Sequence, residues 1–255
     1  MTQTDTMQTT PRTLTPDRID HFREQGFVHI PGIINAEEVE RFRVAALRIY
    51  ETQEGLSARD VFSQHVNVWR GDETMRELTL HPNVAGVARK LAGVSLRLWH
   101  DQILVKRPHN NTPTEFHQDQ PYWPHDGSPN PISAWIALCD VPVERGCMSF
   151  LPGSHRRTDL ERQDLSDARS LFGICPDLQW SPRVTVPLKA GDCTFHHGRC
   201  AHMANANETD EPRVAHVVIY MDAAARYDGK GHVVTDPLGL KLGDALAGEM
   251  FPELG

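Results

Sequence analysis

The sequence is poor in three features, each of which would indicate a particular class of protein. Its 255 residues contain no apolar stretch long enough to cross a bilayer, and the opening MTQTDTMQTTPR lacks the apolar region of a signal peptide. Excess positive charge is also missing, because the formal net charge is −8. The five cysteines are scattered without a CxxC pair, which argues against a disulfide framework. We therefore expect a cytoplasmic protein that acts on neither membranes nor nucleic acids.

The composition is that of a globular protein with a substantial core. Hydrophobic residues make up 39% of the chain and charged residues 24%. Residues 1–13 are rich in Thr and Gln, so we expect a disordered tail there, followed by a single domain over residues 14–255. Helix-start signals at Thr15 and Asn35 predict two helices near the beginning of this domain.

Beyond Gly93 the pattern changes from helical to extended. Turns rich in Pro, Gly and Asn separate short apolar runs. The predicted strands are 96–106, 115–120, 132–139, 148–151, 184–188, 193–197 and 213–221. This order predicts a mainly β fold, a jelly-roll barrel buttressed by N-terminal helices. The tail from Asp222 to Gly255 is irregular and is expected to cover the mouth of the barrel.

Residues 61–70 alternate in a way that predicts one more strand. Its two faces carry Phe62, Gln64, Val66 and Val68 on one side, and His65, Asn67 and Trp69 on the other. We expect His65 and Asn67 to face the cavity and contact the substrate. A polar strand face open to water would have the same pattern.

The pair His117 and Asp119 is by its spacing alone a weak signal for a metal site. The two residues are two apart, so on a strand their side chains leave the same face. An imidazole and a carboxylate can bind a metal, but an ion pair at a strand end has the same spacing. Prolines on both sides, at 113 and at 121 and 124, place the pair where a strand meets a rigid loop. A metal site at this position needs a third ligand from elsewhere.

The candidates for that third ligand lie in the segment 191–202. His196, His197 and His202 each have an imidazole that could be the third metal ligand. A zinc site built on Cys193, Cys200 and His202 lacks a fourth ligand at the usual short spacing. With one of the histidines, the set is two imidazoles and one carboxylate on one side of the metal, which suits non-haem Fe(II).

Arg213 begins a strand whose apolar face indicates an inward direction. It shares that face with Ala215, Val217 and Ile219. A buried guanidinium is stabilised by an anionic partner, and its planar set of N–H groups can bond to both oxygens of a carboxylate. The partner could be a bound ligand or an internal Asp or Glu.

Several blocks of the sequence resemble one known family. They are LTPDRIDHFREQGFVHIPGIINAEEVERFR, DQILVKRP, FHQDQPYWP, SAWIALCDVPVERGCMSFLPGSHR and AGDCTFHHGRCAHMANANETDEPRVAHVVIYM. From Leu14 to about Tyr220 the chain is similar to the phytanoyl-CoA dioxygenase-like branch of the Fe(II)/2-oxoglutarate oxygenases. The resemblance implies a double-stranded β-helix fold and the use of Fe(II), 2-oxoglutarate and O2.

The resemblance also assigns roles to individual residues. It implies that His117, Asp119 and His202 bind Fe(II) and that Arg213 holds the distal carboxylate of 2-oxoglutarate. Trp135 and Gln102 stand where the family's other cosubstrate-lining residues stand, although the first could be core and the second a solvated strand residue. The family often has a small hydroxyl residue at the position of Ala204, and Thr194 is a candidate to supply that hydroxyl here.

The implied activity is the hydroxylation, or another oxidation, of a C–H bond in a small-molecule metabolite. Natural products and amino-acid-like molecules are the expected substrates. Related halogenases have a small residue in place of the metal-binding carboxylate, so Asp119 favours oxygen insertion over halogenation. Two other classes are compatible with the same barrel: a metal-dependent cupin-like isomerase or hydrolase without 2-oxoglutarate, and a non-catalytic binding module. The oligomeric state is not predicted.

Overall fold

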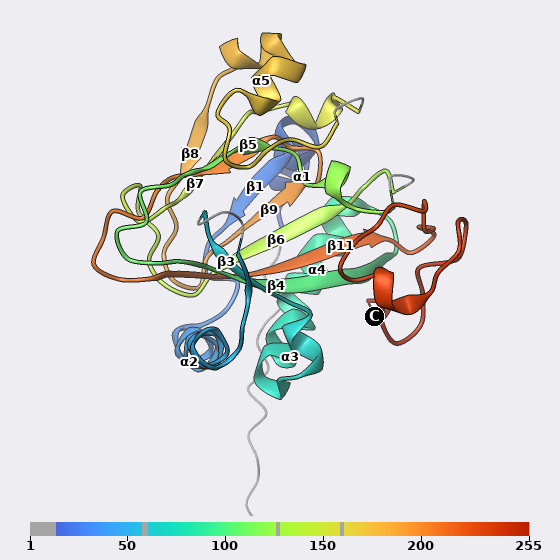
Figure 1. Cartoon of the computed structure of the whole chain (residues 1–255), viewed down its shortest axis with the longest axis horizontal. Helices are drawn as coiled ribbons and strands as arrows, with labels where there is room; N and C mark the ends of the chain where they lie inside the picture. Colours follow the sequence, from blue (N-terminus) through green and yellow to red (C-terminus); the bar gives the residue numbers. More distant parts are fainter. Residues whose placement is uncertain (1–13, 58–60, 126–127, 159–160, 255) are drawn as a thin grey trace, which may run out of the picture.

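A computed structural model describes residues 14–57, 61–125, 128–158 and 161–254. The tail predicted at residues 1–13 lies outside the described residues. Two antiparallel sheets form the centre of the fold, and helices flank them (Figure 1). The prediction of a mainly β jelly roll with N-terminal helices is confirmed. Among the described residues no strand pairing joins the two sheets into a closed barrel.

The larger sheet has seven strands in the order β1-β9-β6-β11-β4-β3-β2. These strands are β1 (Phe27–Ile30), β2 (Leu56–Ser57), β3 (Ser63–Val66), β4 (Leu96–Lys106), β6 (Ile132–Ala137), β9 (Cys193–His197) and β11 (Arg213–Asp222). The smaller sheet has the order β5-β10-β7-β8. Its strands are β5 (Thr114–His117), β7 (Met148–Phe150), β8 (Val184–Val186) and β10 (His202–Ala204).

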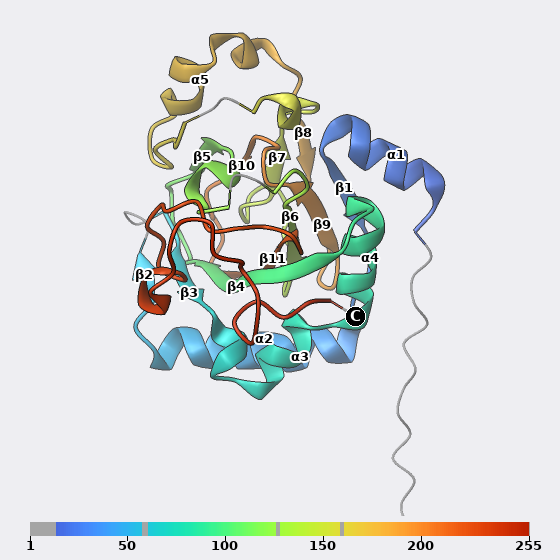
Figure 2. The ribbon, with the colours of Figure 1, turned by 90° about the vertical axis from the view of Figure 1, so that its right-hand side faces the viewer.

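Helices cover the outer face of the larger sheet (Figure 2). They are α1 (Pro16–Gln25), α2 (Ala36–Thr52), α3 (Glu73–Thr79) and α4 (Pro82–Ala92), whereas α5 (Ser170–Ile174) lies beside the smaller sheet. The predicted helix starts are both confirmed. Asn35 opens α2 with a capping box, in which its side chain accepts a hydrogen bond of 2.9 Å from the Glu38 backbone N–H.

The two faces of the larger sheet have different roles. Val214, Val218 and Tyr220 of β11 belong to the core shared with the helices. The alternate residues Ala215, Val217 and Ile219 belong to a second core on the opposite face. Arg213 shares the parity of the second set, so its side chain points toward the space between the sheets, as the sequence predicts.

The C-terminal segment 223–254 crosses one end of the sheets and returns to β4 (Figure 2). Backbone hydrogen bonds join Leu98 to Pro252 and Leu254 to Leu96 at 3.0 Å each. Phe251 stacks on Trp99 with ring centroids 5.4 Å apart. The tail is therefore an ordered cover. None of the helices within the described ranges has the length and apolar character to span a membrane.

Candidate metal centre and its cavity

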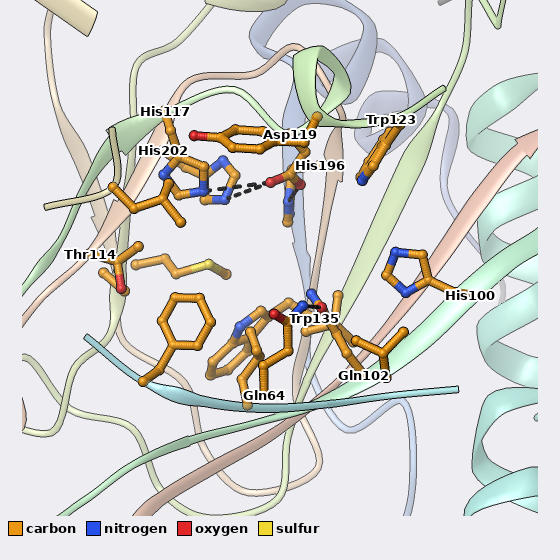
Figure 3. Close-up of a pocket in the computed structure, with 18 of the residues that line it drawn as sticks. Gln64, His100, Gln102, Thr114, His117, Asp119, Trp123, Trp135, His196 and His202 are labelled. Atoms are coloured by element: carbon orange, nitrogen blue, oxygen red, sulfur yellow. Dashed lines mark hydrogen bonds and ion pairs between the residues drawn. The ribbon is translucent and has the colours of Figure 1, made fainter. Parts of the chain in front are cut away.

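His117, Asp119 and His202 form a group that could hold a metal ion. One ligand atom from each lies within 4.8 Å of the others. His117 ends β5 and His202 begins β10, and the two residues are directly opposite in the antiparallel pair. Asp119 Oδ1 lies 3.5 Å from His117 Nε2 and 3.8 Å from His202 Nε2 (Figure 3). The three donor atoms therefore converge on one point.

Backbone carbonyls fix the tautomers of both imidazoles. His117 Nδ1 is 2.7 Å from the Glu115 carbonyl oxygen, and His202 Nδ1 is 3.0 Å from that of Cys200. A carbonyl only accepts, so each Nδ1 carries the proton and each Nε2 presents its lone pair to the shared point. Burial lowers the pKa of His202 to about 3, so this ring is neutral, as a metal ligand must be.

Two further side chains orient the Asp119 carboxylate. Its Oδ2 accepts a hydrogen bond from Ser133 Oγ at 3.1 Å and lies 3.3 Å from His196 Nε2, which leaves Oδ1 for a metal. Burial by itself would raise the pKa of Asp119, but the imidazoles of His202, His117 and His196 hold it well below its usual range. The carboxylate is therefore charged and directed.

The hydrogen bonds distinguish the three candidate histidines. His196 contacts the carboxylate through Nε2. In His197, Nε2 donates to the Pro129 carbonyl at 3.0 Å and Nδ1 accepts from the Arg199 N–H at 3.0 Å, so both nitrogens are occupied away from the site. Only His202 of the three joins the metal-binding group. A zinc site with Cys193 and Cys200 is not formed by the described residues.

The donor set fits a first-row transition metal with open positions. Two imidazole nitrogens and one carboxylate oxygen come from one side, and the cavity lies on the other. This is the ligand arrangement that suits non-haem Fe(II).

Removing the hydroxyl of Ser133 should weaken metal binding without removing a ligand. We expect Ser133→Ala to lower the affinity for a divalent metal by about 10-fold or more, because groups that orient a ligand typically contribute 10- to 100-fold. Titration of the apoprotein with Co(II), followed by absorption, measures this. Ser149→Ala is the matched control, since that buried hydroxyl bonds Thr185 outside the site. Equal affinities in both variants would contradict the orienting role of Ser133.

Arg213 is a buried cation without an acidic partner. The residue is only 2% exposed, and its Nε and Nη1 atoms have no hydrogen-bond partner among the described residues. The guanidinium carbon lies 5.2 Å from the centroid of a Trp135 ring. Burial lowers the pKa of Arg213 to about 10, so the group stays charged at neutral pH. The alternative of an internal salt bridge is not supported by the described ion pairs.

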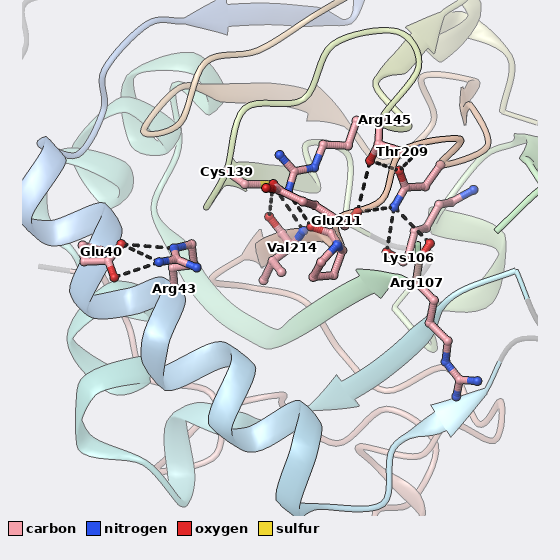
Figure 4. A network of polar contacts seen from close by, with 11 residues as sticks. Glu40, Arg43, Lys106, Arg107, Cys139, Arg145, Thr209, Glu211 and Val214 are labelled. Atoms are coloured by element: carbon pink, nitrogen blue, oxygen red, sulfur yellow. Dashed lines mark hydrogen bonds and ion pairs between the residues drawn. The ribbon is translucent and has the colours of Figure 1, made fainter. Parts of the chain in front are cut away.

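A neighbouring arginine shows the contrast (Figure 4). Arg145 has an ion pair of 2.7 Å with Glu211 and donates to the Pro212 carbonyl at 2.9 Å. Its charge is compensated just before β11 begins. Arg213 instead faces the cavity, whereas burial lowers the pKa of its cross-strand neighbour Lys106 to about 6, and the Lys106 amine donates to the carbonyls of Thr112 and Asn205 at 2.9 Å each. The uncompensated charge of Arg213 therefore creates a preference for an anion at this end of the cavity.

The cavity has a volume of about 240 Å³ and lies between the two sheets. Trp135, Gln102 and Ala204 line it, so Trp135 is not merely core and Gln102 is not a solvated strand residue. Gln64 donates a hydrogen bond to Gln102 across β3 and β4 (Figure 3). Thr194 lies opposite Trp135, and its buried hydroxyl has no partner among the described residues, although Thr194 does not line the cavity.

The prediction that His65 and Asn67 face the cavity is wrong. His65 pairs with Ile103, which packs toward the helices, whereas Gln64 pairs with Leu104, which lines the cavity. Cross-strand partners share a face, so this register turns His65 outward. Asn67 has φ 57° and lies beyond β3, which ends at Val66, at the start of the 3-10 helix Val68–Arg70. Phe62, Gln64 and Val66 line the cavity instead.

Sequence reasoning missed a group of cavity residues at the end remote from Arg213. They are His100, Trp123, His232 and Val233. His100 lies in the predicted strand 96–106, and His232 lies in the tail expected to cover the barrel mouth. No local pattern marks either residue.

Comparisons with known proteins agree with this geometry. The family model described as "Phytanoyl-CoA dioxygenase (PhyH)" matches residues 22–215. Mouse phytanoyl-CoA dioxygenase domain-containing protein 1 is 28% identical over 158 residues, 60% of this chain and 54% of that protein. The chain thus spans little more than half the length of this curated relative.

Two solved structures are similar over nearly their whole length. The non-heme alpha ketoglutarate dependent carbocyclase SnoK from nogalamycin biosynthesis is 42% identical, with a TM-score of 0.87, covering 97% of this chain and 99% of SnoK. The epimerase SnoN in complex with Fe3+, alpha ketoglutarate and nogalamycin RO is 39% identical, with a TM-score of 0.84, covering 94% and 98%.

Proposed function

The chain belongs to the phytanoyl-CoA dioxygenase family, and on that premise we propose that it is an iron- and 2-oxoglutarate-dependent oxygenase that oxidises a C–H bond of a small-molecule natural product. The cofactor set Fe(II), 2-oxoglutarate and O2 follows from the family and from the solved relatives that use iron and the keto acid.

One observation carries this proposal beyond family membership. An uncompensated buried cation, Arg213, faces the same cavity as the His117, Asp119 and His202 group. A metal-dependent isomerase or hydrolase with no keto acid gives this cation no anion to bind. A dicarboxylate that binds the metal through one end and Arg213 through the other satisfies both features.

In this proposal the cavity residues have two roles, binding the metal and positioning the cosubstrate. His117, Asp119 and His202 hold the metal from one side and leave its other positions to the cavity. Arg213 and the Gln64–Gln102 pair orient the cosubstrate. Bound iron and 2-oxoglutarate supply the activation of oxygen that allows an unreactive C–H bond to be broken. The apolar side chains of Leu104, Met148 and Val217 limit water in the cavity.

Hydroxylation is the outcome we propose, because Asp119 keeps the carboxylate ligand. Ring closure is the second candidate, because SnoK, a carbocyclase by its name, is 42% identical over nearly the whole chain. Both outcomes begin with removal of a substrate hydrogen, and they differ in whether oxygen is then added or a ring is closed.

Product analysis separates these outcomes. The Fe(II)-loaded protein would be incubated with 2-oxoglutarate, oxygen and a panel of aromatic natural products that includes nogalamycin RO. We expect succinate to form in step with a product that has gained one oxygen atom. A product that has lost two hydrogens instead excludes hydroxylation, and an NMR spectrum of that product without a new C=C bond indicates ring closure rather than desaturation. Conversion without oxygen uptake or succinate would overturn the proposal and favour the isomerase or hydrolase class.

A further inference from the structure

The cavity has a second end whose chemistry differs from that of the Arg213 end. On β4, Lys106 lies opposite Arg213 and His100 lies opposite Ile219. This length of strand corresponds to roughly 20 Å. If the cosubstrate binds at Arg213 and the metal lies beside it, the His100 end is left for the substrate. The polar groups at the His100 end therefore indicate which polar groups the substrate has.

His100 offers a hydrogen-bond acceptor to this end. Its Nδ1 is 3.2 Å from the Asp101 carbonyl oxygen, which can only accept, so Nδ1 carries the proton. The other nitrogen, Nε2, is then an acceptor, and it has no hydrogen-bond partner among the described residues. The residue is 3% exposed and lines the cavity (Figure 3). This acceptor therefore faces the cavity, where a donor group of a ligand can bond to it.

His232 offers the complementary donor. Its Nδ1 accepts a hydrogen bond of 3.2 Å from the Val234 N–H, so the proton of the neutral ring is on Nε2. The backbone around it is fixed: its N–H donates to Asp236 Oδ1 at 2.8 Å, and its carbonyl accepts from Thr235 and Asp236 at 2.9 Å each. The donor is therefore held in place by its own turn.

Both rings are uncharged, and flat side chains surround them. Burial lowers the pKa of His100 to about 3 and that of His232 to about 4. Their ring centroids are 5.6 Å apart, with no hydrogen bond between them. The indole of Trp123 lines the same end, and Trp99 contacts both imidazoles at 5.7 and 5.2 Å. Flat walls of this kind suit a planar ring.

We propose that this end of the cavity binds the substrate through a hydroxyl group on a ring, which donates to His100 Nε2 and accepts from His232 Nε2–H. A hydroxyl is the smallest neutral group that can do both. The proposal rests on the proposed function of the cavity and specifies its substrate class. His232 lies outside residues 22–215, the part matched by the family model, so this donor comes from the tail and not from the shared family region.

Two matched probes test the roles of His100 and His232 by binding alone, with no reaction needed. 1-Naphthol can both donate and accept, whereas 1-methoxynaphthalene can only accept. Binding of each to the Fe(II)- and 2-oxoglutarate-loaded protein would be measured by anaerobic equilibrium dialysis. We expect a preference for the naphthol of about fivefold, the ratio that corresponds to one hydrogen bond of about 1 kcal/mol.

The variants have different expected signatures. His100→Phe should abolish the preference for naphthol, because only naphthol donates to His100. His232→Phe should weaken both probes by about fivefold and keep the preference. His21→Phe, at an exposed position on α1, is the matched control and should change neither affinity. His232 is half-buried, so its variant and the native ratio test the pair even if His100→Phe does not fold.

Three results would overturn the proposal: equal affinities of the native protein for the two probes, a preference that survives in His100→Phe, or no binding of naphthol at millimolar concentration. Failure of the proposed function is a separate result. If iron and 2-oxoglutarate do not load, the same comparison on the metal-free protein still measures the hydroxyl preference.

Discussion

Replacing His202 with alanine is expected to abolish metal binding and 2-oxoglutarate turnover, whereas replacing His197 with alanine is expected to preserve both. His202 Nε2 is one of three donors that converge within 4.8 Å, and its Nδ1 is fixed by the Cys200 carbonyl. Loss of this ligand should cost more than the roughly 10- to 100-fold in metal affinity expected for a residue that only orients a ligand.

His197 is the matched control because it is adjacent to the site and also buried. Both of its ring nitrogens bond to the backbone, at Pro129 and Arg199. His197→Ala should therefore cost about 2 kcal/mol of folding stability, about 1 kcal/mol for each hydrogen bond lost, and leave metal affinity unchanged. Isothermal titration with Fe(II) under anaerobic conditions measures the affinities, and succinate release measures turnover. Metal binding that survives in His202→Ala and is lost in His197→Ala would contradict the assigned ligand set.

Replacing Arg213 with alanine is expected to raise the apparent KM for 2-oxoglutarate with a much smaller effect on kcat. The guanidinium is buried, charged and without an acidic partner among the described residues. Truncating one partner of a buried charge pair costs about 2 kcal/mol or more, which corresponds to about 30-fold or more in affinity. The apparent KM of Arg213→Lys should lie between those of the native protein and Arg213→Ala, because lysine keeps the charge but lacks the planar guanidinium.

Arg145→Ala is the matched control for this prediction. Its guanidinium lies close to the start of β11 but is paired with Glu211 (Figure 4). Steady-state kinetics with varied 2-oxoglutarate gives both parameters for each variant. An unchanged KM in Arg213→Ala, or an equal rise in Arg145→Ala, would show that Arg213 does not bind the cosubstrate.

Local sequence spacing pointed to two of the three members of the metal group, His117 and Asp119. His117 and Asp119 do lie together, but not as neighbours on one strand as predicted: β5 ends at His117, and Asp119 has helical φ and ψ of −76° and −44° at the start of the 3-10 helix Gln120–Tyr122. The third ligand depends on the antiparallel pairing of His202 with His117, which is a long-range contact. Residue types alone left His196, His197 and His202 equivalent, and the resemblance to a family was needed to choose among them.

The substrate end shows where local patterns stop being informative. Alternation separated the two faces over residues 62–66, but β3 ends at Val66, and Val68, predicted on the face of Gln64, packs in the helix-side core. Only the register with β4 determines which face of β3 meets the cavity. A one-residue difference in that register exchanges Gln64 and His65. His232 is positioned by a turn in the irregular tail, where no periodicity is present to predict a direction.

Anaerobic titration with Fe(II) and 2-oxoglutarate tests the central claim most directly. We predict a broad visible charge-transfer band that saturates at one equivalent of Fe(II), persists in His197→Ala and is lost in His202→Ala. A native protein that binds Fe(II) tightly at this site but develops no visible band with 2-oxoglutarate would contradict the account.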